Sequence, residues 1–124
     1  MIVAIIEDDI AIVQMYRMKF EADGYEVITA GDGESGLELL KKAQPQPDIL
    51  LLDLMMPNVN GDEMLIELRK TDNGKNLPVI VLTNMGENEA PTSIKDDEMV
   101  KDFIVKASMT PKDVADKVAD VLDN

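Results

Sequence analysis

Short apolar runs alternate with amphipathic segments along the whole chain. The runs suited to buried strands cover Ile2–Ile6, Tyr25–Thr29, Ile49–Leu52, Leu77–Leu82 and Phe103–Val105. Between them, apolar residues recur three or four positions apart, which is the spacing of one helix face. Strands that alternate with helices favour a parallel sheet with helices on both faces. Right-handed crossovers then give a doubly wound α/β fold, whose crevice we expect beyond the carboxyl ends of the strands.

Capping residues mark where several helices begin and end. The first helix is expected over Ile10–Ala22, with Asp9 as N-cap and Gly24 beyond its end. The second is expected to stop before Pro45-Gln46-Pro47, and the third to end near Asn73-Gly74.

The sequence defines the last helix well and the one before it poorly. Thr110-Pro111-Lys112-Asp113 offers an N-cap, a proline at the first helical position and an acid two positions later. The segment before it, GENEAPTSIKDDEMV at 86–100, contains Pro91 and few apolar residues. We therefore expect a fourth helix that is short or irregular.

Length and charge narrow the class of protein. The 124 residues suffice for a single domain, taken here as residues 1–124. Twenty-five acidic against twelve basic residues give a net charge of −13. Such a field repels nucleic acid and anionic membranes, so neither is expected as a direct partner. It suits solubility, basic protein patches or divalent cations.

The chain has no cysteine and no histidine. Their absence excludes disulfides, thiolate catalysis, imidazole bases and His- or Cys-ligated metals. Any metal is expected to be hard and oxygen-ligated, such as magnesium, calcium or manganese. The opening MIVAII has no basic residue and is interrupted by Glu7, so it reads neither as a signal peptide nor as a membrane span, and we expect a cytoplasmic location.

Polar residues gather where the predicted strands end. Glu7-Asp8-Asp9 follows the first strand, Asp53 the third, Thr83-Asn84 the fourth and Lys106 the fifth. If the first and third strands are neighbours, their carboxylates meet in one crevice. Their mutual repulsion would raise their pKa values or require a counter-cation. A divalent ion, with Lys106 as a second positive charge, would meet that need.

Each of these residues has a simpler interpretation when taken alone. Acids after a strand commonly cap the next helix, a strand-end threonine is ordinary, and a lysine there is usually solvated. A buried strand ending in aspartate also resembles the magnesium-binding strand of P-loop enzymes, but the chain has no GxxxxGK[ST] motif.

Taken together and in order, the motifs resemble the receiver domains of two-component response regulators. IIEDD at 5–9 resembles the acidic pair of that family, and DILLLDLMMPNVNG at 48–61 its phosphoacceptor strand and loop, including Pro57 and Gly61. VIVLTN at 79–84 and DFIVKAS at 102–108 resemble the segments that carry its hydroxyl residue, lysine and aromatic residue. The resemblance covers essentially the whole chain. It implies a flavodoxin-like (βα)5 sandwich with strand order 2-1-3-4-5, in a stand-alone, chemotaxis-type receiver.

The resemblance also implies a function and a site. Asp53 would accept a phosphoryl group from the phosphohistidine of a sensor histidine kinase or a histidine phosphotransfer protein, with Mg²⁺ (or Mn²⁺) as cofactor. The chain would catalyse only its own phosphorylation and dephosphorylation, and would then signal to a downstream protein. The implied metal ligands are Glu7 (through water), Asp8, Asp53 and the backbone carbonyl of Met55. The implied phosphoryl contacts are Lys106, the Thr83 hydroxyl and the Asn84 backbone N–H, and the implied switch residues are Thr83 and Phe103.

The sequence departs from the family pattern at several positions. Ala107 replaces a proline that is commonly cis, so we expect a trans Lys106–Ala107 peptide. Asn84 replaces a small residue, and is expected to narrow access to the phosphoryl group and slow its hydrolysis. Met99-Val100 replaces a common Gly-Ala, which with Pro91 makes the fourth-helix surface atypical. The chain ends at Asn124 with no output domain, as in a stand-alone receiver or one cut from a longer regulator.

Other functions stay open at this point. A phosphohydrolase of the haloacid-dehalogenase type also uses a strand-end aspartate, but Asp53-Leu54-Met55 lacks the second acid that would protonate a leaving group. A flavin binder would need a phosphate loop where Glu7-Asp8-Asp9 would repel phosphate. A receiver that retains only a binding role is a further alternative. Separately, the alternative to a switch role for Phe103 is an ordinary core aromatic.

Overall fold

The computed structural model describes residues 1–56, 60–84 and 90–123, with Ala107 described by its backbone alone. Strands and helices alternate strictly along the chain. They are β1 (Ile2–Ile6), α1 (Ile10–Ala22), β2 (Glu26–Ala30), α2 (Gly33–Lys42), β3 (Ile49–Asp53), α3 (Gly61–Leu68), β4 (Val79–Thr83), α4 (Thr92–Lys95), β5 (Val100–Val105) and α5 (Pro111–Leu122). A short 3₁₀ helix, Lys106–Ser108, follows β5.

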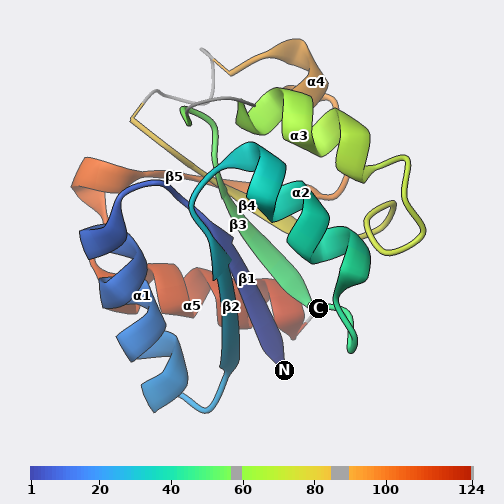
Figure 1. Cartoon of the computed structure of the whole chain (residues 1–124). Helices are drawn as coiled ribbons and strands as arrows, with labels where there is room; N and C mark the ends of the chain where they lie inside the picture. Colours follow the sequence, from blue (N-terminus) through green and yellow to red (C-terminus); the bar gives the residue numbers. More distant parts are fainter. Residues whose placement is uncertain (57–59, 85–89, 124) are drawn as a thin grey trace.

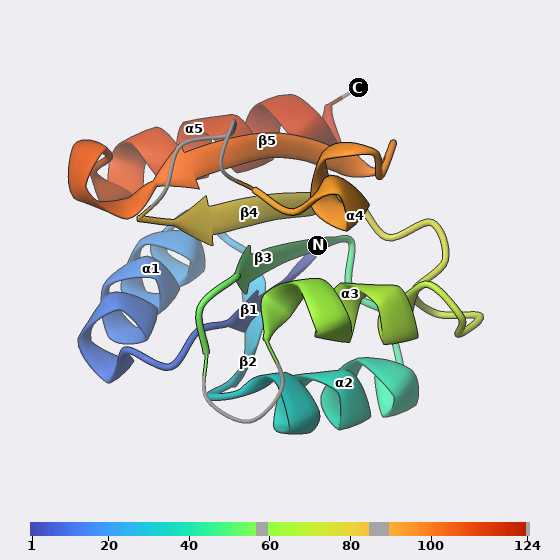
Figure 2. The same cartoon turned by 90° about the horizontal axis from the view of Figure 1, so that it is seen from above.

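The strands form one parallel sheet in the order β2-β1-β3-β4-β5, as the resemblance implies. Helices α1 and α5 cover one face of the sheet, and α2, α3 and α4 cover the other (Figures 1 and 2). Every residue of β1, β3 and β4 is buried. This explains why these strands are continuously apolar, since a parallel strand between two helical layers has no solvated side.

Alternate residues of the strands supply the two halves of the core. Along β1, Ala4 and Ile6 pack with α2, α3 and α4, whereas Val3 and Ile5 pack with α1 and α5. This is the period of two expected for a β-strand. The sheet is thereby fixed between its layers, which makes the carboxyl ends of the strands a rigid platform.

The predicted helix caps are confirmed. Asp9 accepts hydrogen bonds from the backbone N–H groups of Ala11 and Ile12, and Thr110 forms a capping box with Asp113. Gly24 follows α1 with a φ of 94°, a backbone conformation that glycine adopts without steric cost. The expected short fourth helix is also confirmed for the described residues, since α4 covers only Thr92–Lys95.

Several predicted boundaries are wrong. The fourth strand begins at Val79 rather than Leu77, and the second at Glu26 rather than Tyr25. Pro78 has no N–H to donate to the ladder, and only its carbonyl joins the sheet, by accepting from Leu50. The fifth strand begins at Val100 rather than Phe103, because an edge strand tolerates polar residues on its solvated side.

The predicted end of the third helix is also wrong. Helix α3 stops at Leu68, well before Asn73-Gly74. The hydroxyl of Thr71 donates to the Leu68 carbonyl at 2.7 Å and accepts from the Gly74 N–H at 3.0 Å. These local bonds offer the chain a turn in place of another helical turn.

Within the described part of the chain, no helix has both the length and the apolar content needed to cross a bilayer.

Candidate functional site

Three carboxylates meet at the carboxyl edge of the sheet, as predicted. Because β1 and β3 are neighbours in register, with Ile6 beside Leu52, the residues that follow them also lie side by side. One side-chain oxygen each from Glu7, Asp8 and Asp53 lies within 4.8 Å of the others. Glu7 and Asp53 are each only 1 % exposed, whereas Asp8 is exposed. The cluster therefore combines two buried acids with one that faces solvent.

Lys106 places a single positive charge between the two buried acids. Its Nζ lies 2.5 Å from Oε1 of Glu7 and 3.1 Å from Oδ2 of Asp53. Apart from this ion pair, those two oxygens accept no hydrogen bond from the described residues. Two buried carboxylates share one lysine, so the site carries excess negative charge.

The electrostatics of the site follow from this imbalance. Burial, and next the nearby Asp53 carboxylate, raise the pKa of Glu7 to about 7, against the opposing effect of Lys106. A hydrogen bond with Glu7 lowers the pKa of Asp8. Burial lowers the pKa of Lys106, but the ion pairs with Glu7 and Asp53 outweigh it and raise the pKa overall. The raised pKa keeps the lysine charged, whereas the raised pKa of Glu7 means that its burial opposes its ionisation.

The donor set fits a hard divalent cation. The candidate ligand atoms are all carboxylate oxygens, and two of these oxygens are buried with no hydrogen-bond partner among the described residues beyond their ion pair with Lys106. Magnesium and manganese prefer oxygen ligands of this kind, and their charge would offset the local excess. The predicted carboxylate ligands Glu7, Asp8 and Asp53 are thus brought together.

The loop after β3 is held close to the strand that precedes it. The N–H of Met55 donates to Oδ1 of Asp53 at 3.0 Å, which fixes the orientation of the carboxylate. The N–H of Gly61 donates to the Leu54 carbonyl at 3.1 Å. A Cβ at Gly61 would lie 2.8 Å from Cα of Leu54 and would also collide with the Asp53 carbonyl. The Met55 carbonyl stays a predicted ligand, and Pro57 lies outside the described residues.

The fourth strand brings Thr83 to the same edge of the sheet. Asp53 pairs with Leu82 in the ladder, and Thr83, the next residue, pairs with Val105 just before Lys106. Thr83 is 1 % exposed and Asn84 is exposed. The predicted hydroxyl residue therefore lies between the strands that carry Asp53 and Lys106, and the roles of Thr83 and Asn84 stay predictions.

The predicted switch residue Phe103 is half-buried in β5, paired with Val81. It packs against the core on the side of α2, α3 and α4. This position is compatible with a switch and with an ordinary core aromatic, so both interpretations remain. The side chain of Ala107 is outside the described part, and the expected trans Lys106–Ala107 peptide likewise stays a prediction.

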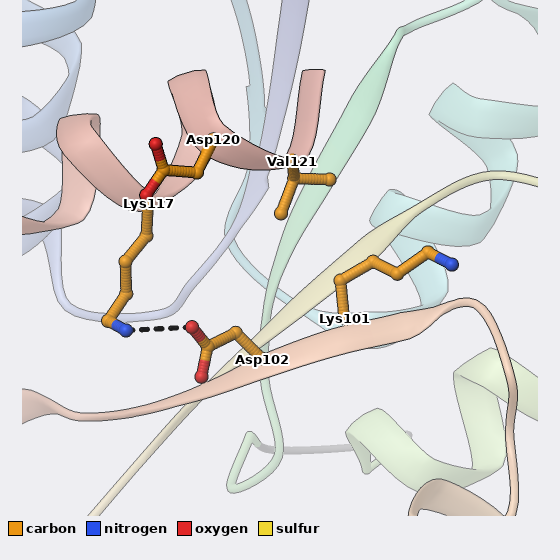
Figure 3. A pocket seen from close by; sticks show the side chains of 5 residues that line it. All are labelled: Lys101, Asp102, Lys117, Asp120 and Val121. Atoms are coloured by element: carbon orange, nitrogen blue, oxygen red, sulfur yellow. Dashed lines mark hydrogen bonds and ion pairs between the residues drawn. The ribbon is translucent and has the colours of Figure 1, made fainter. Parts of the chain in front are cut away.

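Two hollows help to locate the open side of the site. One, of about 280 Å³, is lined by Glu7 and Asp8 together with residues of α1 and the end of β2, so the acidic cluster opens beside α1. A larger one, of about 420 Å³, lies between β5 and α5 (Figure 3). In that hollow Lys117 pairs with Asp102 at 2.7 Å, with Lys101, Asp120 and Val121 around them. None of the acidic-site residues lines it, so size alone does not identify the site.

Sequence reasoning placed Lys106 beside the acidic cluster but did not predict which acid it approaches more closely, and it did not predict the pair of Arg69 with Asp97. Lys106 was expected to neutralise a phosphoryl oxygen, but here it lies closer to Glu7 than to Asp53. Arg69 and Asp97 form a second, partly buried pair at 2.8 Å, between the end of α3 and the turn before β5. The two residues lie 28 positions apart, and no local pattern relates them.

Comparisons with known proteins agree with the geometry. The family model for the response regulator receiver domain matches residues 3–119. The DNA-binding dual master transcriptional regulator RpaA of Synechocystis is 36 % identical over 108 residues, which cover 84 % of this chain and 44 % of RpaA. The chain spans less than half the length of the curated relatives it matches.

Solved structures show the same fold. Chemotaxis response regulator CheY4 of Vibrio cholerae superposes with a TM-score of 0.85 at 28 % identity, covering 97 % of both chains. Response regulator TrrA of Thermotoga maritima, solved in complex with Mg²⁺-BeF, gives a TM-score of 0.80 at 25 % identity and covers 96 % of both chains. With the family model spanning most of the chain and the acidic cluster at the predicted edge, this chain belongs to the family of response regulator receiver domains.

Proposed function

We propose that this receiver domain takes a phosphoryl group onto Asp53 in a magnesium-dependent reaction, as one step of a phosphorelay. The donor is the phosphohistidine of a sensor histidine kinase or a histidine phosphotransfer protein. The observation that carries the proposal is the buried Asp53 carboxylate, 3.1 Å from Lys106 and within 4.8 Å of two further carboxylates. We assign the reaction to the cytoplasm, as the sequence analysis leads us to expect.

The roles of the residues follow from charge and position. An oxygen of Asp53 forms a bond to phosphorus while the bond from phosphorus to the donor nitrogen breaks, and the electron pair leaves with the imidazole. A carboxylate and a phosphoryl group repel each other, and a bound Mg²⁺ would reduce that repulsion. Glu7, Asp8 and Asp53 would hold the ion with the Met55 carbonyl. Lys106 is positioned to neutralise a phosphoryl oxygen, and the Met55 N–H keeps the nucleophile oriented.

The chain needs no general base for this reaction, because an ionised carboxylate is already the nucleophile. The Thr83 hydroxyl and the Asn84 N–H donate to the remaining phosphoryl oxygens. The exposed Asn84 side chain restricts the approach of water and slows hydrolysis. The chain acts on its own aspartyl phosphate and on no other substrate.

Phosphorylation is then passed to a protein partner as a change of surface. Thr83 moves toward its new acceptor, Phe103 turns into the space that it leaves, and β4 and β5 shift as one two-state element. Because the net charge of −13 opposes direct contact with nucleic acid, the output of this domain is a protein contact.

The test is phosphorylation by a small donor such as acetyl phosphate, in the presence of Mg²⁺, followed by intact-mass spectrometry. Wild type is expected to gain the mass of one phosphoryl group, and Asp53→Asn to gain none. Asp72→Asn is the matched control, because it makes the same change at an exposed acid between α3 and β4 that is not part of the acidic cluster, and it should be phosphorylated normally. No gain in wild type would leave a domain that only binds partners, and an equal gain in Asp53→Asn would place the acceptor elsewhere.

The switch is tested separately with Lys106→Ala. This variant is expected to bind Mg²⁺ still, because the carboxylates remain. It should no longer show the NMR shift changes around Phe103 that phosphorylation produces in wild type. If those changes survive, Lys106 does not couple the phosphoryl group to β5.

A further inference from the structure

A groove between α3 and α4 lies on a part of the surface that the acidic cluster does not reach. Its volume is about 280 Å³, and it is lined by Leu65, Ile66, Arg69, Ser93, Asp96 and Asp97. The two helices lie side by side in both views of the molecule (Figures 1 and 2). None of the residues assigned to phosphotransfer lines this groove.

The inner part of the groove is apolar. Leu65 is buried in the core at 1 % exposure, while its neighbour Ile66 is 46 % exposed. Ile66 has much of its surface in contact with water, in a concave place where a partner side chain could cover it. Covering Ile66 would remove apolar surface from water, which favours the binding of an apolar side chain at this place.

One wall of the groove is held by a well-satisfied ion pair. Arg69 donates from Nε to one carboxylate oxygen of Asp97 at 2.8 Å and from Nη2 to the other at 3.1 Å. Arg69 also donates to the carbonyls of Gly74 and Leu77, and Asp97 accepts from the Met99 N–H. The groove therefore exists in the free protein and does not need to be assembled by a ligand, which lowers the cost of binding.

The rim of the groove is acidic once this pair is accounted for. Arg69 and Asp97 neutralise each other, which leaves the exposed Asp96 beside the groove. Among the described residues, Asp96 has no lysine or arginine within ion-pair distance. The molecule as a whole carries a charge of −13, so a second copy of this chain would be repelled. A basic segment would instead be attracted.

We propose that the α3–α4 groove docks a basic amphipathic segment of a partner protein. An apolar side chain of the segment covers Ile66 against Leu65, and a lysine or arginine beside it faces Asp96. This docking does not require phosphorylation of Asp53, so the inference stands or falls apart from the proposed phosphotransfer.

The experiment uses a synthetic helical peptide of leucine and lysine, titrated into the ¹⁵N-labelled full chain and followed by NMR. Peptide-induced shifts are expected to centre on Leu65, Ile66, Ser93 and Asp96. A charge-reversed peptide of leucine and glutamate should bind at least tenfold more weakly. Shifts spread evenly over the acidic surface, shifts centred elsewhere or the absence of binding would overturn the proposal.

Matched variants separate the groove from general charge attraction. Ile66→Lys should weaken the leucine–lysine peptide about tenfold or more, because it removes the apolar anchor and adds repulsion. Met18→Lys likewise replaces an exposed apolar residue with lysine, but on α1, and should have a much smaller effect. Asp96→Asn should weaken binding about two- to fivefold at low salt, and Asp72→Asn less.

The remaining outcomes are also decisive. Equal weakening by each variant and its control would mean that the peptide senses only net charge, which overturns the proposal. Shifts at Ile66 that depend on protein concentration without peptide would show that a second copy occupies the groove, which also overturns it. Asp53→Asn should bind the peptide as wild type does, whether or not the phosphotransfer proposal holds.

Discussion

Two regions of the molecule contain buried or partly buried charges, and the charges are paired differently in the two regions. At the carboxyl edge of the sheet, Glu7 and Asp53 share one lysine, and an oxygen of each has no other partner among the described residues. Between α3 and β5, Arg69 and Asp97 form a two-point ion pair, and both side chains make further bonds to the backbone. We call the first region incomplete, because its two acids share a single positive charge. We call the second complete, because each charged group has a partner of opposite charge.

This difference separates a site for chemistry from a structural bond. A buried charge with its partners in place can stabilise the fold, whereas a buried charge without them lowers its stability. The excess negative charge at the sheet edge is therefore expected to lower the stability of the fold until a positive charge binds there. The Arg69–Asp97 pair needs nothing further, and its consequence is a fixed distance between α3 and the start of β5.

The largest effect is expected from breaking the complete pair. Arg69→Ala leaves Asp97 partly buried without its partner, and should lower the free energy of unfolding by about 3 kcal/mol in urea titrations. Phosphorylation by a small donor should survive in this variant under conditions where it still folds. A loss below about 1 kcal/mol would mean that the pair contributes no more than a surface one.

Removing an acid from the incomplete region should raise the free energy of unfolding, whereas breaking the complete pair should lower it. Burial raises the pKa of Glu7 in the folded protein from 4.5 to about 7. The stabilisation that follows from this raised pKa is fully present below about pH 4.5, and it is lost as the pH rises through 7. Glu7→Gln avoids that loss.

The metal-free Glu7→Gln variant should therefore exceed wild type by about 2 kcal/mol at pH 8 and match it near pH 4.5, with a chelator present. Glu98→Gln, at an exposed position, is the control and should show no such dependence on pH. A variant less stable than wild type at pH 8 would show that the bond from Glu7 to Lys106 outweighs the cost of burial.

Adding magnesium tests the same imbalance from the other side. At ten times its dissociation constant, Mg²⁺ should stabilise wild type by about 1.4 kcal/mol, measured by thermal or urea unfolding. Asp8→Asn removes an exposed carboxylate of the cluster, so it should fold normally and lose most of this gain. Arg69→Ala should retain the gain, and its loss there would mean that the two regions are coupled.

The smallest effect is expected at an exposed ion pair. Arg17 and Glu21 lie 3.5 Å apart on α1, with side chains 46 % and 52 % exposed. Because water screens such pairs, Arg17→Ala should change the free energy of unfolding by less than about 0.5 kcal/mol. A loss near that of Arg69→Ala would remove the distinction between surface and buried pairs on which the comparison depends.

The sequence predicted the sheet edge because its residues belong to the local order of the chain. Parallel strands present their carboxyl ends on one side, so acids that directly follow two buried strands meet once those strands are neighbours. For Glu7 and Asp53 the one further piece of information was the strand order, which the family resemblance implied and the structure confirms. The apolar runs of β1 and β3 were equally plain, since strands buried on both faces have no polar alternation.

Features that depend on distant partners could not be predicted in this way. The start of β5 contains Lys101 and Asp102, which break the apolar run, and Asp102 is accommodated by Lys117 on α5. Arg69 reads from the sequence as one more charge at the end of a helix. Its role depends on Asp97, 28 positions later, and only the folded structure brings the two together.

Gly61 sets a limit on how the sheet edge can vary. The chain returns there directly over Asp53 and Leu54, with no room for even a methyl group. Substitutions at solvent-facing helical positions can be absorbed locally, but a side chain at Gly61 would displace the backbone that carries the nucleophile. A designer who wishes to alter the specificity of this domain should therefore leave the return of this loop untouched and diversify the helical surfaces, where a change of partner does not alter the chemistry.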